Sequence, residues 1–191
     1  KLEEQRKPYL HITEPANSEE QALKLGGEDI YRIFIKEYTE KQWGCPATEL
    51  PAFIIRRLPF RFVYDNNYFN DPYQGIPIGG YNLLTDSLLD GIEVKCDTNY
   101  FDNREYFDSL ADKIVFTGCI DEFFNYEFGH LDYRSLRFEH ERLGMEDFQG
   151  NAVVNYNEAS VPFTRIIEHK HFEFGKQSHT VITREYPQAY E

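Results

Sequence analysis

Apolar residues in the first third of the chain recur every three or four positions, which is typical of amphipathic helices. The capping-box spacing at residues 18–21 predicts that a first helix begins at Ser18, and Gly26-Gly27 should end it. A second helix is expected from Glu28 or Asp29. Its expected apolar face comprises Ile30, Ile33, Phe34 and Tyr38.

A third, short helix should run from about Pro51 to Arg57, with Thr48 as its cap and Pro59 just beyond its end. From residue 60 the pattern changes to alternation, which predicts strands. A helix over 81–89, entered through Gly79-Gly80, interrupts them. The predicted strands span 60–64, 92–96, 113–117, 133–141, 151–156, 162–174 and 179–185.

Helices followed by antiparallel strands predict an α+β fold. We expect a helical region at residues 1–60 and a mainly antiparallel sheet region at residues 61–191, with one inserted helix. The chain starts with a lysine and is expected to be a segment of a longer protein.

Composition narrows the possible partners. With 41% hydrophobic residues, the 191-residue chain can form a core. Its formal net charge of −13 argues against nonspecific nucleic-acid binding and against an anionic membrane surface. No apolar run reaches membrane-spanning length. We therefore predict neither a nucleic-acid partner nor membrane insertion.

The three cysteines form no C-x-x-C pair, so neither a disulfide framework nor a zinc ribbon is predicted and a reducing cytoplasm is favoured. His169 and His171 would share one face of a strand, but Glu168 would point to the other face and no third ligand has a recognisable spacing. No metal site is expected, and no local signature of nucleophilic catalysis occurs.

Aromatic and arginine side chains are concentrated between residues 38 and 80. Aromatic faces can stack on a base, and guanidinium groups bind phosphate oxygens in a bidentate manner. This combination suggests a nucleotide-sugar site. The residues that carry it are Tyr38, Trp43, Arg56, Arg57, Arg61, Tyr64, Tyr68, Phe69 and Tyr73.

Two arginines and the tryptophan also have a purely structural interpretation. Arg57 and Arg165 could form salt bridges with carboxylates of this acidic chain, and Trp43 could pack in a core rather than stack on a sugar. Arg165 lies among apolar neighbours on a predicted strand, so it needs an anion, whether a carboxylate or a ligand phosphate. The glycine-rich segment 75–80 is neither a dinucleotide fingerprint nor a Walker loop.

Several long blocks give the sequence a strong resemblance to a known family. They are YTEKQWG, ELPAFIIRRLPFRF, DNNYFNDPYQGIPIGGY, LDYRSLRFE, FQGNAVVNY, VPFTRIIEHKHFEFG and TVITREYP. From about residue 19 to residue 186 the chain resembles UDP-galactopyranose mutase, a flavoenzyme that interconverts UDP-galactopyranose and UDP-galactofuranose.

The resemblance implies roles for individual residues. Arg57 matches an arginine on a mobile lid that closes over the substrate diphosphate, and Arg165 matches a fixed arginine that holds the same group. Tyr68 matches a phosphate-binding tyrosine, and Asn155 a residue near the sugar. The residues implied to receive the uridine and the adjoining substrate are Phe34, Tyr38, Thr39, Gln42 and Trp43.

The resemblance also implies FAD, active when reduced, but the chain lacks the family's glycine-rich βαβ unit and its closing flavin-contacting segment. Val94, Thr117 and Gly118 are the only expected cofactor contacts, and they cannot form a full site. The chain is therefore expected to be the inactive middle part of the enzyme, which as a full-length protein is compatible with a homodimer. The alternatives are a non-catalytic nucleotide-sugar binding module, a different flavin oxidoreductase and a structural fragment without a ligand.

Overall fold

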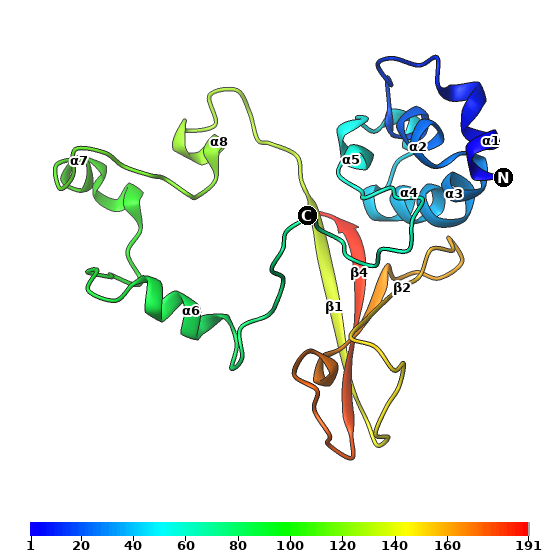
Figure 1. Cartoon of the computed structure of the whole chain (residues 1–191). Coiled ribbons are helices and arrows are strands. Elements are labelled where there is room, and N and C mark those ends of the chain that lie inside the picture. Colours follow the sequence, from blue (N-terminus) through cyan, green and yellow to red (C-terminus); the bar gives the residue numbers. More distant parts are fainter. Residues whose placement is uncertain (191) are drawn as a thin grey trace. The chain divides into compact units, whose positions relative to one another are not determined.

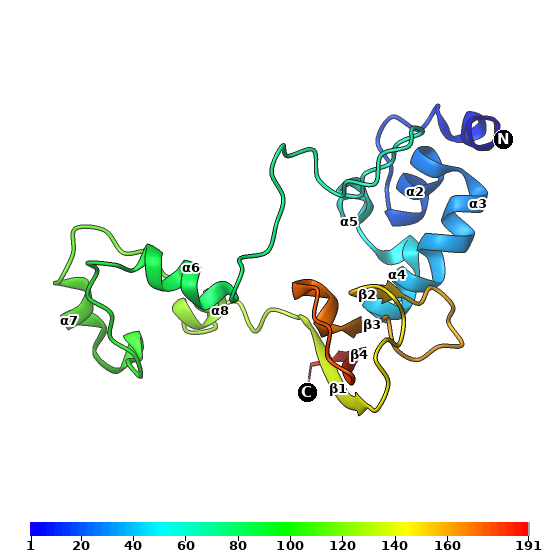
Figure 2. The same cartoon turned by 60° about the horizontal axis from the view of Figure 1, so that its bottom comes forward.

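A computed structural model describes residues 1–190 and confirms the predicted α+β fold, with short helices and one four-stranded antiparallel sheet. The chain forms two compact units. The first comprises residues 1–74 together with the chain from residue 133 onward, and the second comprises residues 75–132. The helical and sheet regions, expected to divide near residue 60, thus belong to one unit. Figures 1 and 2 show both units.

The helices of the first unit pack around one small core. They are α1 (Leu2–Arg6), η1 (Lys7–Tyr9), α2 (Ser18–Gly26), α3 (Glu28–Ile30), η2 (Tyr31–Lys36), α4 (Glu37–Trp43), η3 (Ala47–Glu49) and α5 (Phe53–Arg56). The buried core residues are Ala22, Tyr31, Ile35, Ala47, Leu50, Ile54 and Ile55. In the described part of the chain, no helix is both long enough and apolar enough to span a bilayer.

Helix α2 begins where predicted, but its cap lies one residue earlier. The Asn17 side chain accepts a hydrogen bond from the Glu20 amide at 3.0 Å, and the Glu20 carboxylate accepts one from the Ala16 amide at 2.9 Å. Gly27, with φ of +80°, ends the helix as expected. The predicted cap of α5 is wrong, because Thr48 lies within η3 and Ala52 precedes α5.

The helix from Glu28 to Trp43 contains a π-helical segment, η2, and this corrects the predicted apolar face. Tyr31 and Ile35 are buried in the core, whereas Ile33 and Phe34 are 46% and 55% exposed. A π turn adds a residue to the helical repeat and so rotates the side chains that follow it. The expected face at Ile33 and Phe34 therefore points away from the core.

The sheet has the strand order β1-β4-β3-β2, and every pairing is antiparallel. Its strands are β1 (Arg134–Leu143), β2 (Val153–Asn155), β3 (Arg165–Glu168) and β4 (Thr180–Ala189). The register places Asn155, Arg165 and Glu185 side by side across β2, β3 and β4. Helices α2 to α5 gather at one end of this sheet (Figures 1 and 2).

The strand predicted over 162–174 is shorter than expected, because η5 (His169–Glu173) follows β3 directly. The segments 60–64, 92–96 and 113–117 are not strands either. A strand needs a neighbour to receive its backbone hydrogen bonds, and within residues 1–190 none pairs with these segments.

The second unit consists of short helices joined by extended segments. They are α6 (Tyr81–Leu88), η4 (Tyr100–Asn103), α7 (Arg104–Asp108) and α8 (Ile120–Phe123), of which α6 matches the predicted helix. No residue between 75 and 132 is buried. Its main side-chain cluster surrounds Tyr100, which packs with Phe116 and Phe123, and Arg104 lies over the Phe123 ring at 4.4 Å.

Candidate substrate site

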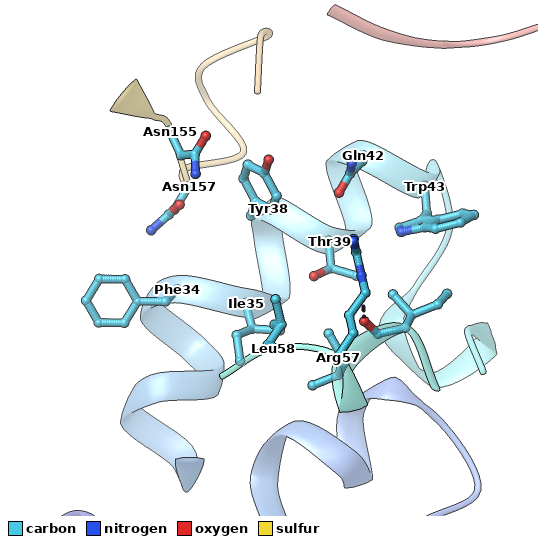
Figure 3. A pocket seen from close by; sticks show the side chains of 12 residues that line it. Phe34, Ile35, Tyr38, Thr39, Gln42, Trp43, Arg57, Leu58, Asn155 and Asn157 are labelled. Carbon is cyan, nitrogen blue, oxygen red and sulfur yellow. Dashed lines mark hydrogen bonds between the residues drawn. The ribbon is translucent and has the colours of Figure 1, made fainter. Parts of the chain in front are cut away.

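A cavity of about 180 Å³ lies in the first unit, between the helix that contains η2 and α4, the end of α5 and the segment after β2. Figure 3 shows its walls. The residues that line it are Phe34, Ile35, Tyr38, Thr39, Gln42, Trp43, Ile54, Ile55, Arg57, Leu58, Asn155 and Asn157. Seven of them are residues that the sequence analysis had named as substrate-binding or catalytic candidates.

One helix supplies the longest wall. Phe34, Tyr38 and Gln42 all line the cavity from this helix, and Thr39 and Trp43 lie beside them (Figure 3). Phe34 is 55% exposed and Trp43 is 36% exposed, so neither is a core residue. Exposed aromatic faces beside amide and hydroxyl groups suit a ligand with a flat ring and polar edges.

Arg57 follows α5 and contributes the only charged side chain among the described residues that line the cavity. Its Nε donates to the carbonyl oxygen of Ile54 at 3.3 Å, and the side chain points toward α4 (Figure 3). Within residues 1–190, no carboxylate forms an ion pair with Arg57. The salt-bridge interpretation considered for this residue is therefore wrong in this structure, and the remaining N–H donors can bind an anion.

Arg165, the first residue of β3, has a different environment. Its Nη2 donates to the Tyr38 hydroxyl at 2.9 Å, and its Nε lies 3.1 Å from the Glu185 carboxylate in an ion pair. The carboxylate also accepts a hydrogen bond from Thr164 Oγ1 at 3.1 Å. Of the two anions considered for Arg165, a carboxylate and a ligand phosphate, the structure therefore provides the carboxylate. Arg165 does not line the cavity but contacts it through Tyr38.

The opposite wall comes from the end of β2. Asn155 is its last residue and pairs with Arg165 in the sheet register. Asn157 follows and donates from Nδ2 to the carbonyl oxygen of Ile33 at 3.3 Å. Asn157 was missed from sequence, although its position two residues after Asn155 in the NYN run was a usable signal.

The remaining candidates lie elsewhere. Tyr68 does not line the cavity; it is 47% exposed and packs edge-on against Phe69, with ring centroids 4.8 Å apart. Val94, Thr117 and Gly118 belong to the second unit, where Val94 is 54% exposed and a side chain at Gly118 would collide with the Phe116 ring. These three residues form no enclosed flavin site within the described chain.

The histidines after β3 do not share a face, because they lie in the 3-10 turn η5 rather than on a strand. His169 Nε2 lies 2.6 Å from Thr183 Oγ1, whereas His171 Nε2 lies 3.2 Å from the Glu168 carboxylate and 3.4 Å from that of Asp147. The ligand atoms of His171, Glu168 and Asp147 lie within 4.8 Å of one another, a grouping not expected from sequence.

Glu168 is fully buried, and its carboxylate already has protein partners. It accepts hydrogen bonds from the Phe148 and Gln149 amides and from Thr180 Oγ1 at 3.0, 2.9 and 2.7 Å. Burial alone would raise its pKa, but these hydrogen bonds and the nearby His171 together hold the pKa of the carboxyl below its usual range. The hydrogen bonds from the Phe148 and Gln149 amides to Glu168 therefore tie the 147–149 turn to β3.

Comparison with known proteins identifies the family. The sequence model of the family described as "UDP-galactopyranose mutase" matches residues 33–191. The chain belongs to the UDP-galactopyranose mutase family. Members of this family are flavin-dependent, and the matched region includes the whole cavity wall from Phe34 to Asn157.

Individual relatives agree with this assignment. The chain is 43% identical over 166 residues to a dTDP-fucopyranose mutase of Escherichia coli, covering 84% of this chain and 44% of that protein. It is 41% identical over 182 residues to a probable UDP-galactopyranose mutase of Klebsiella pneumoniae, covering 93% and 46%. A UDP-galactopyranose mutase of Mycoplasma genitalium is 33% identical over 180 residues, covering 85% and 44%. The chain thus spans just under half the length of these relatives.

Proposed function

We propose that this chain is the substrate-binding part of an isomerase that interconverts UDP-galactopyranose and UDP-galactofuranose with reduced FAD. The observation that carries the proposal is the unpaired guanidinium of Arg57 in a cavity otherwise lined by aromatic, amide and apolar side chains. A nucleoside diphosphate needs a stacking surface for its base and a cation for its phosphates, and both are present here.

In this proposal the helix wall receives the nucleoside. The rings of Phe34 and Tyr38 stack against or flank the base, and Thr39, Gln42 and Trp43 contact the adjoining groups. A cavity of about 180 Å³ is smaller than the roughly 300–1,000 Å³ of complete ligand sites, so it suits only part of a nucleotide sugar. The diphosphate and the hexose then extend past Arg57 and Asn155.

The two arginines have separate tasks in the proposed reaction. Arg57 belongs to a lid that closes over the diphosphate. Arg165 is fixed by Glu185 and Tyr38 and binds the same diphosphate, which is the leaving group. Positive charge near the diphosphate favours departure of the nucleotide from the anomeric carbon, most strongly once water is excluded. Tyr68 is proposed as a further phosphate ligand that the lid brings in.

The flavin chemistry requires residues other than those described here, because Val94, Thr117 and Gly118 form no enclosed site. When bound, reduced flavin supplies the nucleophile for the sugar. The proposed protein is cytoplasmic, with a nucleotide sugar as its partner and neither nucleic acid nor membrane. Flavin titration of the protein expressed from its full reading frame separates a mutase from a non-catalytic sugar-nucleotide module, which would leave the flavin spectrum unchanged.

A second substrate pair is supported by the 43% identity to a dTDP-fucopyranose mutase. Calorimetric titration with UDP and with dTDP, followed by turnover assays on UDP-galactopyranose and dTDP-fucopyranose, discriminates between the two. Tighter UDP binding with turnover of UDP-galactopyranose supports our proposal, and the reverse preference supports the fucose substrate. Flat titrations with both nucleotides would refute nucleotide-sugar binding altogether.

A further inference from the structure

Lys41, on α4, is held in an unusual way. Its Nζ lies within hydrogen-bonding distance of four backbone carbonyl oxygens: those of Tyr156 at 2.8 Å, Glu158 at 3.0 Å, Val161 at 2.9 Å and Phe163 at 2.9 Å. An ammonium group has only three N–H bonds, so four acceptors use its whole hydrogen-bonding capacity and share at least one donor. Lys41 is therefore not available to bind a substrate phosphate.

The four carbonyls all belong to one segment, residues 156–163, which connects β2 to β3. Immediately before it lies Asn155, a cavity residue, and just after it lies Arg165. Two further contacts attach the same region to the helix: the Glu37 carboxylate accepts from the Ala159 amide at 2.6 Å, and Asn157 donates to the carbonyl of Ile33 at 3.3 Å. Lys41 thus makes the most connections between the two walls.

Its place in the helix explains why this matters for the cavity. Tyr38 and Thr39 precede Lys41 and Gln42 and Trp43 follow it, and all four line the cavity. The segment held by Lys41 carries no regular secondary structure, and few backbone hydrogen bonds of its own fix it: the Tyr156 amide donates to the Thr164 carbonyl at 2.9 Å and the Val161 amide to the Glu158 carbonyl at 3.2 Å. Without the ammonium, several of its carbonyls would lose their charged hydrogen-bond partner.

We propose that Lys41 is a positioning residue of the substrate site, which sets the distance between the helix wall and the wall formed by Asn155 and Asn157. This inference rests on the proposed function. Small displacements of binding groups weaken ligand contacts steeply, because hydrogen bonds and ion pairs depend on distance and angle.

The test uses Lys41→Met in the protein expressed from its full reading frame, with Lys36→Met as the matched control. Lys36 is an exposed lysine of the same helix, and within residues 1–190 it forms no hydrogen bond or salt bridge with the 156–163 segment. We expect UDP to bind Lys41→Met roughly 10- to 100-fold more weakly by calorimetry with unchanged stoichiometry, and Lys36→Met to bind as the wild type does. Amide hydrogen exchange should accelerate within residues 156–163 and not in α2.

Each other result has a defined meaning. A purely structural lysine would lower the stoichiometry and leave the dissociation constant of the folded fraction unchanged, which would overturn the inference. Wild-type protein that does not bind UDP would instead refute the proposed function. If Lys41→Met does not fold, Lys41→Arg keeps the charge and several donors but has a larger head group. A wild-type dissociation constant together with faster loop exchange in Lys41→Arg would also overturn the inference.

Discussion

At the scale of single residues, the two arginines of the proposed diphosphate site differ in the protein groups that they contact. Arg165 is paired with Glu185, which is only 7% exposed, and is hydrogen-bonded to Tyr38. Arg57 has a single backbone acceptor, the Ile54 carbonyl. An arginine with few partners can turn toward an incoming anion. A paired arginine stays in place, and only the N–H donors outside its ion pair can bind the anion.

Replacing Arg57 should therefore affect activity with little effect on folding. In the full-length protein we expect Arg57→Ala to lower turnover by about two or more orders of magnitude, because charge on the leaving diphosphate loses a stabilising partner. The melting temperature should change little. Steady-state kinetics and thermal unfolding measure the two effects. Arg56→Ala is the control, because Arg56, although expected from sequence to belong to the site, is exposed and does not line the cavity.

Arg165→Ala provides the comparison for that prediction. It should lose a similar amount of activity, but it also leaves the Glu185 carboxylate without its ion-pair partner and should cost about 1–3 kcal/mol of stability. Near-normal turnover in Arg57→Ala would contradict the role given to the lid arginine. Equal stability losses in both variants would contradict the difference in environment.

Glu168 should make the first unit sensitive to acid. Its folded-state pKa is lowered, so its contribution to stability is present above the ordinary glutamate pKa of about 4.3 and is lost as the pH falls through the folded value. Glu168→Gln should lower the free energy of unfolding at neutral pH by roughly 1–3 kcal/mol and flatten its decline below about pH 4. Urea unfolding between pH 3 and 7 measures this. Glu173→Gln, an exposed neighbour, should preserve the wild-type slope.

At the scale of elements, residue spacing predicted helix positions better than helix faces. The polar residues around Ser18 and the Gly26-Gly27 pair were sufficient to place α2. The π turn at Tyr31–Lys36 was not predictable from spacing, because it depends on packing Tyr31 and Ile35 into the core. As a result, Phe34, which was expected on the apolar face, is exposed and lines the cavity.

Gly44 ends α4 next to Trp43, with φ of +74° in the left-handed region. Other residues reach this conformation at a cost of about 1–2 kcal/mol, although asparagine tolerates it better. We expect Gly44→Ala to destabilise the first unit by about that amount and Gly44→Asn by less, as measured by chemical unfolding. A side chain at either variant would also meet the Arg134 guanidinium, 2.9 Å from the new Cβ. Equal losses in both variants would mean that this contact, not backbone strain, sets the cost.

At the scale of the whole molecule, the sequence predicted the fold class and most of the sheet, but not which segments lack partners. The alternation at 92–96 and the apolar run at 113–117 are genuine strand patterns, yet a strand forms only beside another strand. The pairing of Arg165 with Glu185 likewise depends on register across twenty residues of chain, which periodicity alone does not fix.

The second unit should not fold by itself. No residue between 75 and 132 is buried, so this segment gains too little from apolar burial to offset its conformational entropy. Expressed alone, residues 75–132 should show no cooperative thermal transition and rapid amide exchange. The intact 191-residue chain, as the comparison, should retain one cooperative transition from its first unit. A sigmoidal melt of the isolated segment would contradict this expectation.

The order of strands in the sheet has a consequence for synthesis on the ribosome. Strand β4 pairs with both β1 and β3, yet it follows both of them along the chain. During translation, β1 must therefore remain without its ten-residue partner until residues 180–189 have emerged. A nascent chain arrested before Thr180 would present an unpaired strand edge, the kind of surface that chaperones bind and that misassembles in crowded conditions.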